Sequence, residues 1–463
     1  MKTFSLLAAA LVLAGCTSLA PEYRRPAAPV PHNWAAAPAP AAQAETAADS
    51  SWQQFFADER LRTLIGQALE HNRDLRVAAA NIERARALYR IGQADRLPTV
   101  SLGAGAAVQR TPGDLSTSGR GETTRRYDLA AGISGYELDF FGRVRSLNEA
   151  ALQEFMATEQ ARHSAQMSLV AEVANAYLAL AADRERQRLA RETLQNQRSA
   201  HLLIQRRVES GVASQIDLQR AQTTVDAARA DLARYTAQAA QAENALALLV
   251  GTSVQPELLP DSLAAVAAHE ALPAGLPSQV LQRRPDIQSA EHRLQAAHAH
   301  IGAARAAFFP SITLTASGGV ASRALAELFS GGAGAWAFVP QIALPIFDGG
   351  RRRAAVDVAE AERKMALAQY EGAVQRAFRE VADALAVRGT LDEQFEAQQS
   401  LVAASAQTHR LSEIRFRQGA QSYLEVLDAQ REMYAAQQAL IGVRLTRLSN
   451  QVLLYKALGG GWA

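Results

Sequence analysis

The side chains with the clearest chemical potential lie close together near the C-terminal end of the sequence. Leu424, Asp428 and Arg431 are spaced by four and three residues, so a helix would place them on one stripe, with Glu425 beside them. An intrahelical ion pair on a solvated face, worth roughly 0.2–0.5 kcal/mol, is one interpretation of Asp428 and Arg431. If three copies of this helix surround an axis, the stripe instead forms rings of apolar and charged groups at a constriction.

The sequence lacks the patterns of enzymes, metal centres and nucleic-acid binding. His292, His298 and His300 do not have the spacing of a zinc pair, and the Ser-Gly-Gly runs at 317–319 and 330–332 lack the lysine of a phosphate loop. The 48 Lys and Arg residues nearly balance the 46 Asp and Glu residues and are scattered along helical faces. We therefore expect no catalysis, no cofactor, no metal and no nucleic-acid partner.

The elements that must position this stripe occur in two copies. Residues 74–102 align without a gap with residues 286–314 at a shift of about 212, and beyond them Gly211 matches Gly419 at a shift of about 208. Such registration indicates a duplicated structural unit. We place the first unit at 56–251 and the second at 279–458, with a C-terminal segment at 459–463. Residues 252–278 form an equatorial linker, which means a linker midway along the stacked helices.

The N-terminus has the form of an export signal. A charged start and the apolar run Phe4–Leu13 indicate a signal peptide at 1–15, which is too short to span a bilayer. The run ends in Leu-Ala-Gly-Cys16, which resembles the lipobox of bacterial lipoproteins and implies that Cys16 is lipidated; a chance cysteine after an ordinary signal peptide is the alternative. Residues 16–55 follow as a tether and equatorial segment, Pro- and Ala-rich at 21–50.

Short alternating stretches predict β-strands directly after two prolines. Pro98 and Pro310 each end a helix that begins about residue 60 or its counterpart, and apolar residues then alternate with small or polar ones over 100–108 and 312–320. Second strands are expected at 127–140 and 335–347. This alternation is typical of lipid-facing barrel strands, although a soluble four-stranded sheet packed on helices would also produce it.

Four strands cannot close a barrel. An open edge in lipid leaves backbone groups unsatisfied, at a cost of several kcal/mol each, so closure requires partner chains. Three chains would supply twelve strands. Beyond the signal we find no apolar run of about 18 residues that would form a membrane-spanning helix.

Very long helices are predicted around the two glycine turns. No proline or glycine interrupts residues 143–207, so this helix would extend roughly 100 Å. After the first turn, ten residues alternate spacings of three and four, which is a coiled-coil seam; in the second copy Arg447 and Asn450 break it. The helix at 60–96 and the one after the turn together match the long helix in length, so we expect them to stack end to end beside it. The seam comprises Leu218, Ala221, Val225, Ala228, Leu232, Tyr235, Ala239, Ala242, Leu246 and Leu249.

Taken together, the motifs resemble the outer membrane factor family of tripartite efflux systems, the TolC-like channels, and in particular its lipoprotein branch that serves resistance-nodulation-division pumps. The resemblance covers almost the entire mature sequence. The motifs are Trp52-Gln53-Gln54-Phe55 with Asp58 and Leu61, Asn72-x-Asp74-Leu75, Phe347-Asp348-Gly349-Gly350-Arg351, and the turns at 211–218 and 419–426.

This resemblance implies a mainly α fold with a membrane β-barrel. Three chains, with four strands each, would form a twelve-stranded barrel continued by a coiled-coil tunnel in the periplasm. The implied function is a passive outer membrane exit duct for drugs and other small molecules, delivered by an inner-membrane pump and a periplasmic adaptor. A type I protein secretion channel uses the same fold, and a lipid-anchored adaptor or scaffold is an alternative from another class.

The resemblance also assigns roles near the turns. It implies that Leu424, Asp428 and Arg431, with Glu425 and Asp217 nearby, form a closed periplasmic gate. The turns would be the tips that meet the adaptor hairpin. Two positions depart from the family pattern, because Gln421 and Phe416 replace an arginine and a tyrosine of a tip network that includes the aspartate matched by Asp217. The tip residues are Val208, Gly211, Val212, Phe416, Gly419 and Ala420.

Overall fold

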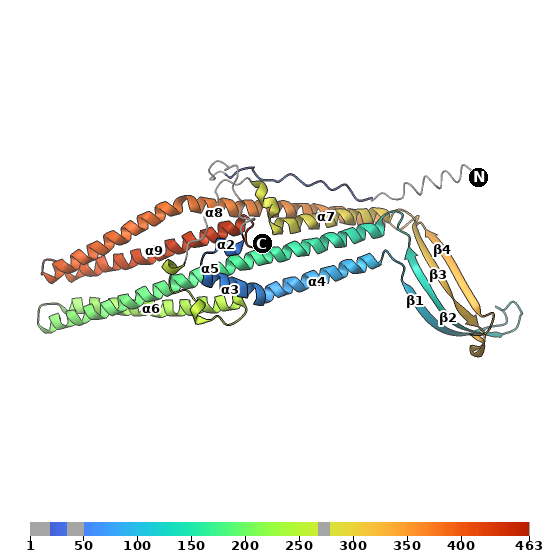
Figure 1. Cartoon of the computed structure of the whole chain (residues 1–463), viewed down its shortest axis with the longest axis horizontal. Coiled ribbons are helices and arrows are strands. Elements are labelled where there is room, and N and C mark those ends of the chain that lie inside the picture. Colours follow the sequence, from blue (N-terminus) through green and yellow to red (C-terminus); the bar gives the residue numbers. More distant parts are fainter. Residues whose placement is uncertain (1–18, 35–50, 267–277, 463) are drawn as a thin grey trace. The chain divides into compact units, whose positions relative to one another are not determined.

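The computed structural model describes residues 19–34, 51–266 and 278–462 (Figure 1). These residues fall into two compact units. The first unit contains the strands, with residues 19–27, 81–158 and 290–370. The second contains the hairpin tips and the segments around residues 51–80 and 440–462. Cys16 and the signal segment lie outside the described residues.

The strands of the first unit form one antiparallel sheet in the order β1-β2-β3-β4 (Figure 1). The strands are β1 Val100–Thr111, β2 Glu122–Glu137, β3 Ser311–Ser322 and β4 Gly334–Ala343. Four strands after the two prolines were predicted, but both ends of the second strand and the end of the fourth were wrong. The second strand begins at Glu122 because its pairing with β1 continues to Thr111, and β4 ends at Ala343, shortly before Pro345 and the 349–350 glycine turn.

The register gives the sheet one apolar face. Leu102 lies opposite Ala131, Ala104 opposite Leu129, and Gly318 opposite Trp336. The alternate positions, such as Asp128 opposite Gly105, carry small or polar residues. The apolar face comprises Val100, Leu102, Ala104, Ala106, Val108, Tyr127, Leu129, Ala131, Ile133, Ile312, Leu314, Ala316, Val320, Trp336, Phe338 and Ile342.

The helix expected from about residue 60 to 96 is two helices, α3 Glu59–His71 and α4 Arg73–Ala94. Asn72, in extended conformation, interrupts it. The Asn72 side-chain oxygen accepts a hydrogen bond from the Leu75 amide at 3.0 Å, so Asn72 caps the second helix. Its Nδ2 donates to the Leu249 carbonyl oxygen at 2.9 Å.

Two pairs of long helices carry the tips. They are α5 Arg143–Glu209 with α6 Gln215–Val250, and α8 Arg351–Arg417 with α9 Tyr423–Ala457. The remaining helices are α2 Trp52–Phe55 and α7 Pro285–Ala306, with short 3-10 turns at Pro256–Leu258, Leu263–Ala265, Ser278–Arg283 and Leu325–Glu327. The predicted uninterrupted helix after Gly142 is therefore confirmed, as is its counterpart after Gly350.

One window inside α5 differs from the expectation of no further apolar run. In the described residues, α5 is the one helix with an 18-residue window apolar enough to cross a membrane, at a mean hydropathy of 1.2. That window is 61% buried within the protein, and it includes the fully buried Tyr177 and Leu178. Burial of this kind is typical of a core helix.

The end-to-end arrangement holds at both helix junctions of the second unit. The α6 C-terminus meets the start of α4 through Asn72 and Leu249, and the α9 C-terminus meets the start of α7 through Arg284, whose Nη1 donates to the Ala457 carbonyl oxygen at 2.9 Å. Arg284 is buried and pairs with Asp286 (2.8 Å) and Glu380 (2.9 Å). Burial alone would lower the pKa of Arg284, but the two carboxylates outweigh it and raise that pKa.

The Trp-Gln-Gln-Phe segment builds the core of this region. Phe55 and Phe56 are fully buried, and Phe55 stacks on Tyr455 with ring centroids 4.0 Å apart. Asp58 is buried and accepts hydrogen bonds from the Arg60 and Leu61 amides, which starts α3. This motif therefore has a packing role.

The seam predicted for α6 faces other helices, since each of its ten residues is buried or half-buried. The two breaks in the second copy have polar partners across the α8/α9 hairpin. Arg447 pairs with Asp392 at 3.1 Å, and buried Asn450 donates to the Ala384 carbonyl oxygen at 3.0 Å. These positions replace apolar packing with specific polar contacts.

The described part of the N-terminal segment is docked and does not hang free. Within the first unit, the Tyr23 hydroxyl and Arg25 Nε both donate to Glu291 Oε1, at 2.9 and 2.7 Å. Within the second unit, Trp34 is buried, stacks on Phe378 and donates from Nε1 to its carbonyl oxygen.

Candidate functional site

The two hairpin tips are sharp reversals that glycine makes possible. Gly211 and Gly419 have φ angles of +77° and +76°, in the left-handed region that other residues adopt at a cost. At the first tip the Val212 amide donates to the Arg207 carbonyl oxygen at 2.8 Å, and the second tip repeats this bond at 2.9 Å. The left-handed turns predicted at both glycines are confirmed, and Val212 is 65% exposed beside the first.

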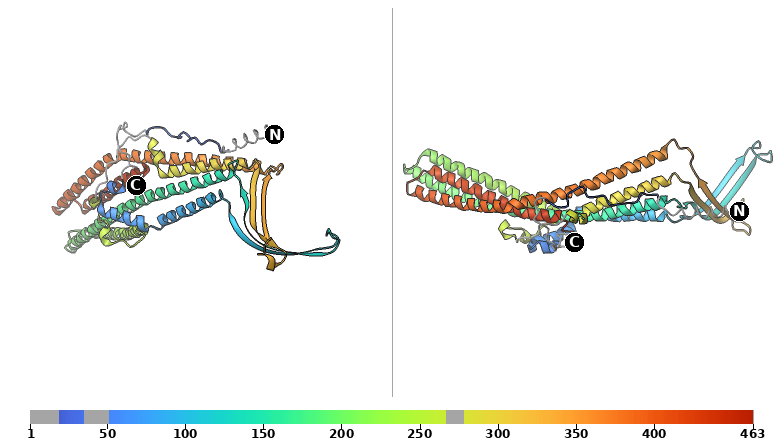
Figure 2. Two further views of the ribbon diagram at one scale, coloured as in Figure 1. Left: turned by 45° about the vertical axis from the view of Figure 1, so that its right-hand side comes forward. Right: turned by 90° about the horizontal axis from the view of Figure 1, so that it is seen from above.

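An apolar cluster joins the two hairpins just behind the tips. The two hairpins lie side by side with their tips at the same end (Figure 2). The tyrosine and two aliphatic residues at the start of α9 pack against α5 and α6, so the tip of one hairpin is held by the other. The sequence placed Val208 and Phe416 at a partner surface, but in this chain both pack onto the cluster. The cluster comprises Ile204, Ala221, Tyr423, Val426 and Leu427, with Val208, Leu218 and Phe416 against it.

Aromatic contacts take the place of the expected tip network. The Arg207 guanidinium lies 4.6 Å from the Phe416 ring centroid, and the Phe416 and Tyr423 rings are 5.4 Å apart. The buried Tyr423 hydroxyl has no hydrogen-bond partner among the described residues. Burial, and then the Asp217 carboxylate, raises the pKa of Tyr423 to about 12.

The acidic residues at the two helix starts make local hydrogen bonds, and Asp217 also caps its own helix. Asp217 Oδ2 accepts hydrogen bonds from the Ser214 amide at 3.2 Å and the Ser214 hydroxyl at 2.7 Å, which forms a capping box. In the second copy, Glu425 accepts hydrogen bonds from Gln421 and from the Ser422 hydroxyl. Gln421, where the resemblance implied an arginine, thus makes a local bond to the first turn of α9.

The stripe on α9 has the geometry that its spacing predicts. Arg431 Nη2 lies 3.1 Å from Asp428 Oδ1, and the two side chains are 63% and 54% exposed. Leu424, one turn earlier, is 37% exposed. Such an exposed pair contributes little within one chain, roughly 0.3 kcal/mol. The stripe is therefore available for contacts beyond the chain.

Sequence reasoning missed a polar link between the hairpins. The Tyr434 hydroxyl on α9 donates to Asp231 Oδ2 on α6 at 3.2 Å, and Arg234 Nη2 lies 2.7 Å from Asp231 Oδ1. Burial, and then Asp231, raises the pKa of Tyr434. Tyr434 is three residues after Arg431, and both line an open groove of about 360 Å³ between α5, α6 and α9. The only signal in the sequence was this continuation of the stripe.

Nothing in the part of the chain that the structure describes is arranged to hold a metal ion, since no three His, Cys, Asp or Glu side chains cluster there. The tips instead offer exposed turns and a stripe of one apolar and two charged residues. A four-stranded sheet with an apolar face, together with duplicated helical hairpins, defines the class of outer membrane channels with long helical extensions.

Comparison with known proteins identifies the family. The model of the outer membrane efflux protein family matches twice, at residues 64–252 and 276–460. The chain is similar to the toluene efflux pump outer membrane protein TtgC of Pseudomonas putida, at 49% identity over 99% of this chain and 95% of TtgC. It is also similar to outer membrane protein OprJ of Pseudomonas aeruginosa, at 44% identity over 99% and 95% of the two chains.

Solved structures agree with this assignment. The open state of the MtrE outer membrane channel of Neisseria gonorrhoeae aligns with a TM-score of 0.87 and 40% identity, covering 96% of this chain and 99% of MtrE. The chain therefore belongs to the outer membrane efflux protein family. It is an efflux channel protein of the outer membrane, with its helices in the periplasm, and members of this family are channels and not enzymes.

Proposed function

We propose that three copies of this chain close one twelve-stranded barrel and serve as the passive outer membrane duct of a tripartite efflux system. The observation that carries the proposal is the sheet: β1 and β4 each pair on one side only within the chain, and one face is apolar. In lipid, such edges require partners. A partner copy supplies the matching β4 and β1 edges, and three copies give an even strand number within the known range.

The stripe of Leu424, Asp428 and Arg431 forms the periplasmic gate of this assembly. Around a threefold axis each of these residues forms a ring. Glu425 lies beside the stripe, and Asp217 lies in the first turn of α6 in the other hairpin of the chain. Exposure of the stripe supports this role, because the pair of Asp428 and Arg431 has contacts to gain between chains. A charged ring at a constriction binds counter-ions and obstructs passage until the helices separate.

The link between Tyr434 and Asp231 braces the closed gate. It ties α9, which carries the stripe, to α6 of the other hairpin, at a point one helical turn beyond Arg431. Opening that moves α9 away from α6 must break this hydrogen bond in each chain. The bond therefore sets part of the free-energy difference between closed and open states.

The exposed tip turns receive the periplasmic adaptor. Gly211, Val212, Gly419 and Ala420 are exposed and lie at the ends of the hairpins. Val208 and Phe416, although packed on the cluster, shape the turns from behind. An inner-membrane pump of the resistance-nodulation-division class supplies the substrates through this adaptor. Drugs and small apolar molecules are the expected cargo, since TtgC is named for toluene efflux.

The remaining assignments follow from the sequence. Residues 1–15 are a signal peptide, Cys16 carries the lipid and 16–55 connect it to the fold. The repeats at 56–251 and 279–458, the linker at 252–278 and the end at 459–463 complete the chain. The hydrogen bonds from Tyr23 and Arg25 to Glu291 support a tether that is bound to α7 along part of its length.

Single-channel conductance in planar bilayers tests the gate. The double variant Asp428→Ala with Arg431→Ala should raise the conductance of the assembled channel, because both charged rings are lost. A matched control is Asp226→Ala with Arg229→Ala, an exposed pair with the same spacing on α6. Equal conductance of the gate variant and the wild type rejects the gate assignment, and a rise in both variants assigns the effect to charge alone.

A further inference from the structure

Two arginines interrupt the apolar face of the sheet at its loop end. Along β1 this face carries Val100, Leu102, Ala104, Ala106 and Val108, and the next residue on it is Arg110. Val108 pairs directly with Arg125 on β2, so Arg125 is on the same face as Val108. Both arginines are exposed.

The two arginines are diagonal neighbours. Arg125 lies opposite Val108, and Arg110 lies two residues further along β1, opposite Thr123. Diagonal positions on one face are about 7 Å apart, which long side chains span easily. The two guanidinium groups can therefore act on one ligand, and they repel each other when no anion lies between them.

No carboxylate of the described residues neutralises this pair. Arg126, the neighbour on the opposite face, pairs with Asp128 at 3.3 Å. By contrast, Arg110 and Arg125 have no ion-pair partner in the described parts of the chain, and the register places Glu122 on the opposite face, across from Thr111. The lumen-facing arginine is satisfied internally, whereas the lipid-facing pair is not.

The depth of the pair matches a lipid headgroup. From Val100 to Val108 the strand rises about 27 Å, or roughly 20 Å of depth at a tilt of about 40°. Arg110 lies about 5 Å further along, at the edge of an apolar band about 25 Å tall. Because the helices are periplasmic, the strand ends that join at the 112–121 loop face the outer leaflet.

The second hairpin of the sheet has no such pair. At the corresponding places β3 carries Ser322, two residues after Val320, and the cross-strand partner of Val320 is Gly334. The duplication therefore did not impose the arginines. They are specific to the first hairpin, where they form one cationic site per chain.

We propose that Arg110 and Arg125 bind a phosphate of a phosphorylated glycolipid in the outer leaflet of the outer membrane. Guanidinium groups match phosphate oxygens in a bidentate manner, and the apolar face below them accommodates acyl chains. Tyr127 and Trp336, on the same face, suit the boundary between chains and headgroup. This site rests on the barrel proposed above, with the apolar face outward.

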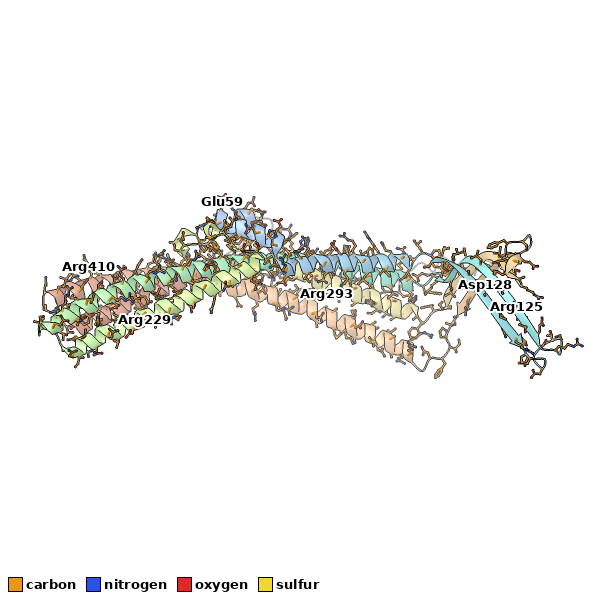
Figure 3. All side chains as sticks on the ribbon, turned by 90° about the horizontal axis from the view of Figure 1, so that it is seen from below. Glu59, Arg125, Asp128, Arg229, Arg293 and Arg410 are labelled. Carbon is orange, nitrogen blue, oxygen red and sulfur yellow. The ribbon has the colours of Figure 1, made fainter. Side chains whose placement is uncertain are left out.

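Native mass spectrometry of the full-length chain in mild detergent tests the site, with lipid A bearing two phosphates as the probe. The wild type should retain this lipid at collision energies that remove phosphatidylglycerol. Arg110→Gln with Arg125→Gln should retain roughly tenfold less, since two charge-assisted contacts are lost. Arg110→Lys with Arg125→Lys should retain an intermediate amount. Arg229→Gln with Arg410→Gln, two exposed helical arginines, is the charge-matched control and should behave as the wild type (Figure 3).

Equal retention by the glutamine variant and the wild type overturns the proposal. Equal retention of phosphatidylglycerol and lipid A by the wild type also overturns it. If the glutamine variant does not assemble, the wild type decides the question, because lipid A that lacks one phosphate should be held more weakly and equal retention refutes the site. The protein mass in the same spectra counts the chains, so failure of the proposed barrel is seen separately from failure of the lipid site.

Discussion

The link between Tyr434 and Asp231 makes a quantitative prediction about opening. Tyr434→Phe removes one hydroxyl that donates to a carboxylate at 3.2 Å. A hydrogen bond to a charged group contributes about 1.5–3 kcal/mol. Asp231 is 28% exposed and keeps Arg234 at 2.7 Å, so its carboxylate is not left unpaired. We therefore expect the loss per chain to be smaller, about 1 kcal/mol.

Three chains multiply this effect if opening breaks all three bonds together. The closed state then loses about 3 kcal/mol relative to the open state, which is roughly a hundredfold change in their ratio. Single-channel recording of the Tyr434→Phe channel in planar bilayers should show this as a higher open probability. The conductance of the open level itself should not change, because the hydroxyl bonds to Asp231 on α6 and the gate residues Leu424, Asp428 and Arg431 are kept.

The control is Tyr235→Phe, which removes the other tyrosine hydroxyl near Asp231 and Arg234. The Tyr235 hydroxyl accepts a hydrogen bond from Arg234 at 3.1 Å, and both residues are on α6, so no link between hairpins is lost. Its open probability should match that of the wild type. An unchanged open probability in Tyr434→Phe, or the same increase in both variants, refutes the brace.

Two further predictions concern the tip and the helix junction. Because the folded pKa of Tyr423 is raised, to about 12, its contribution to stability is complete below pH 10 and is lost as the pH rises through 12. Tyr423→Phe should remove a phenolate absorbance component near pH 12, and an unaltered titration contradicts the assigned burial. Gly251→Ala should lower the thermal unfolding temperature, because φ is +78° and the new Cβ would lie 2.5 Å from the His71 carbonyl oxygen, whereas Gly66→Ala in α3, with open space around it, should not. Equal effects of the two alanines contradict this account.

Local signals made much of the fold predictable. Pro98 and Pro310 end helices in any context, and the alternation after them requires extended backbone. The turns at Gly211 and Gly419 were equally predictable, because a left-handed reversal strongly favours glycine. The break at Asn72 was missed, since its capping bond to Leu75 competes with a helical pattern that continues on both sides.

The candidate site was less predictable, because it depends on contacts between distant segments. Asp217 and Glu425 were expected at a gate, and the local hydrogen bonds that they make with Ser214 and Ser422 were not predicted. The partnership of Tyr434 with Asp231 joins residues 203 positions apart, and neither residue signals it alone. Likewise, the shared face of Arg110 and Arg125 follows from strand register, which the sequence around the loop does not fix.

The central claim is that three chains close one barrel. Native mass measurement of the full-length protein, extracted in mild detergent, tests it most directly by counting the chains in the intact assembly. The account predicts a single species with the mass of three chains. A stable species of one chain, with its β1 and β4 edges unpartnered, contradicts it.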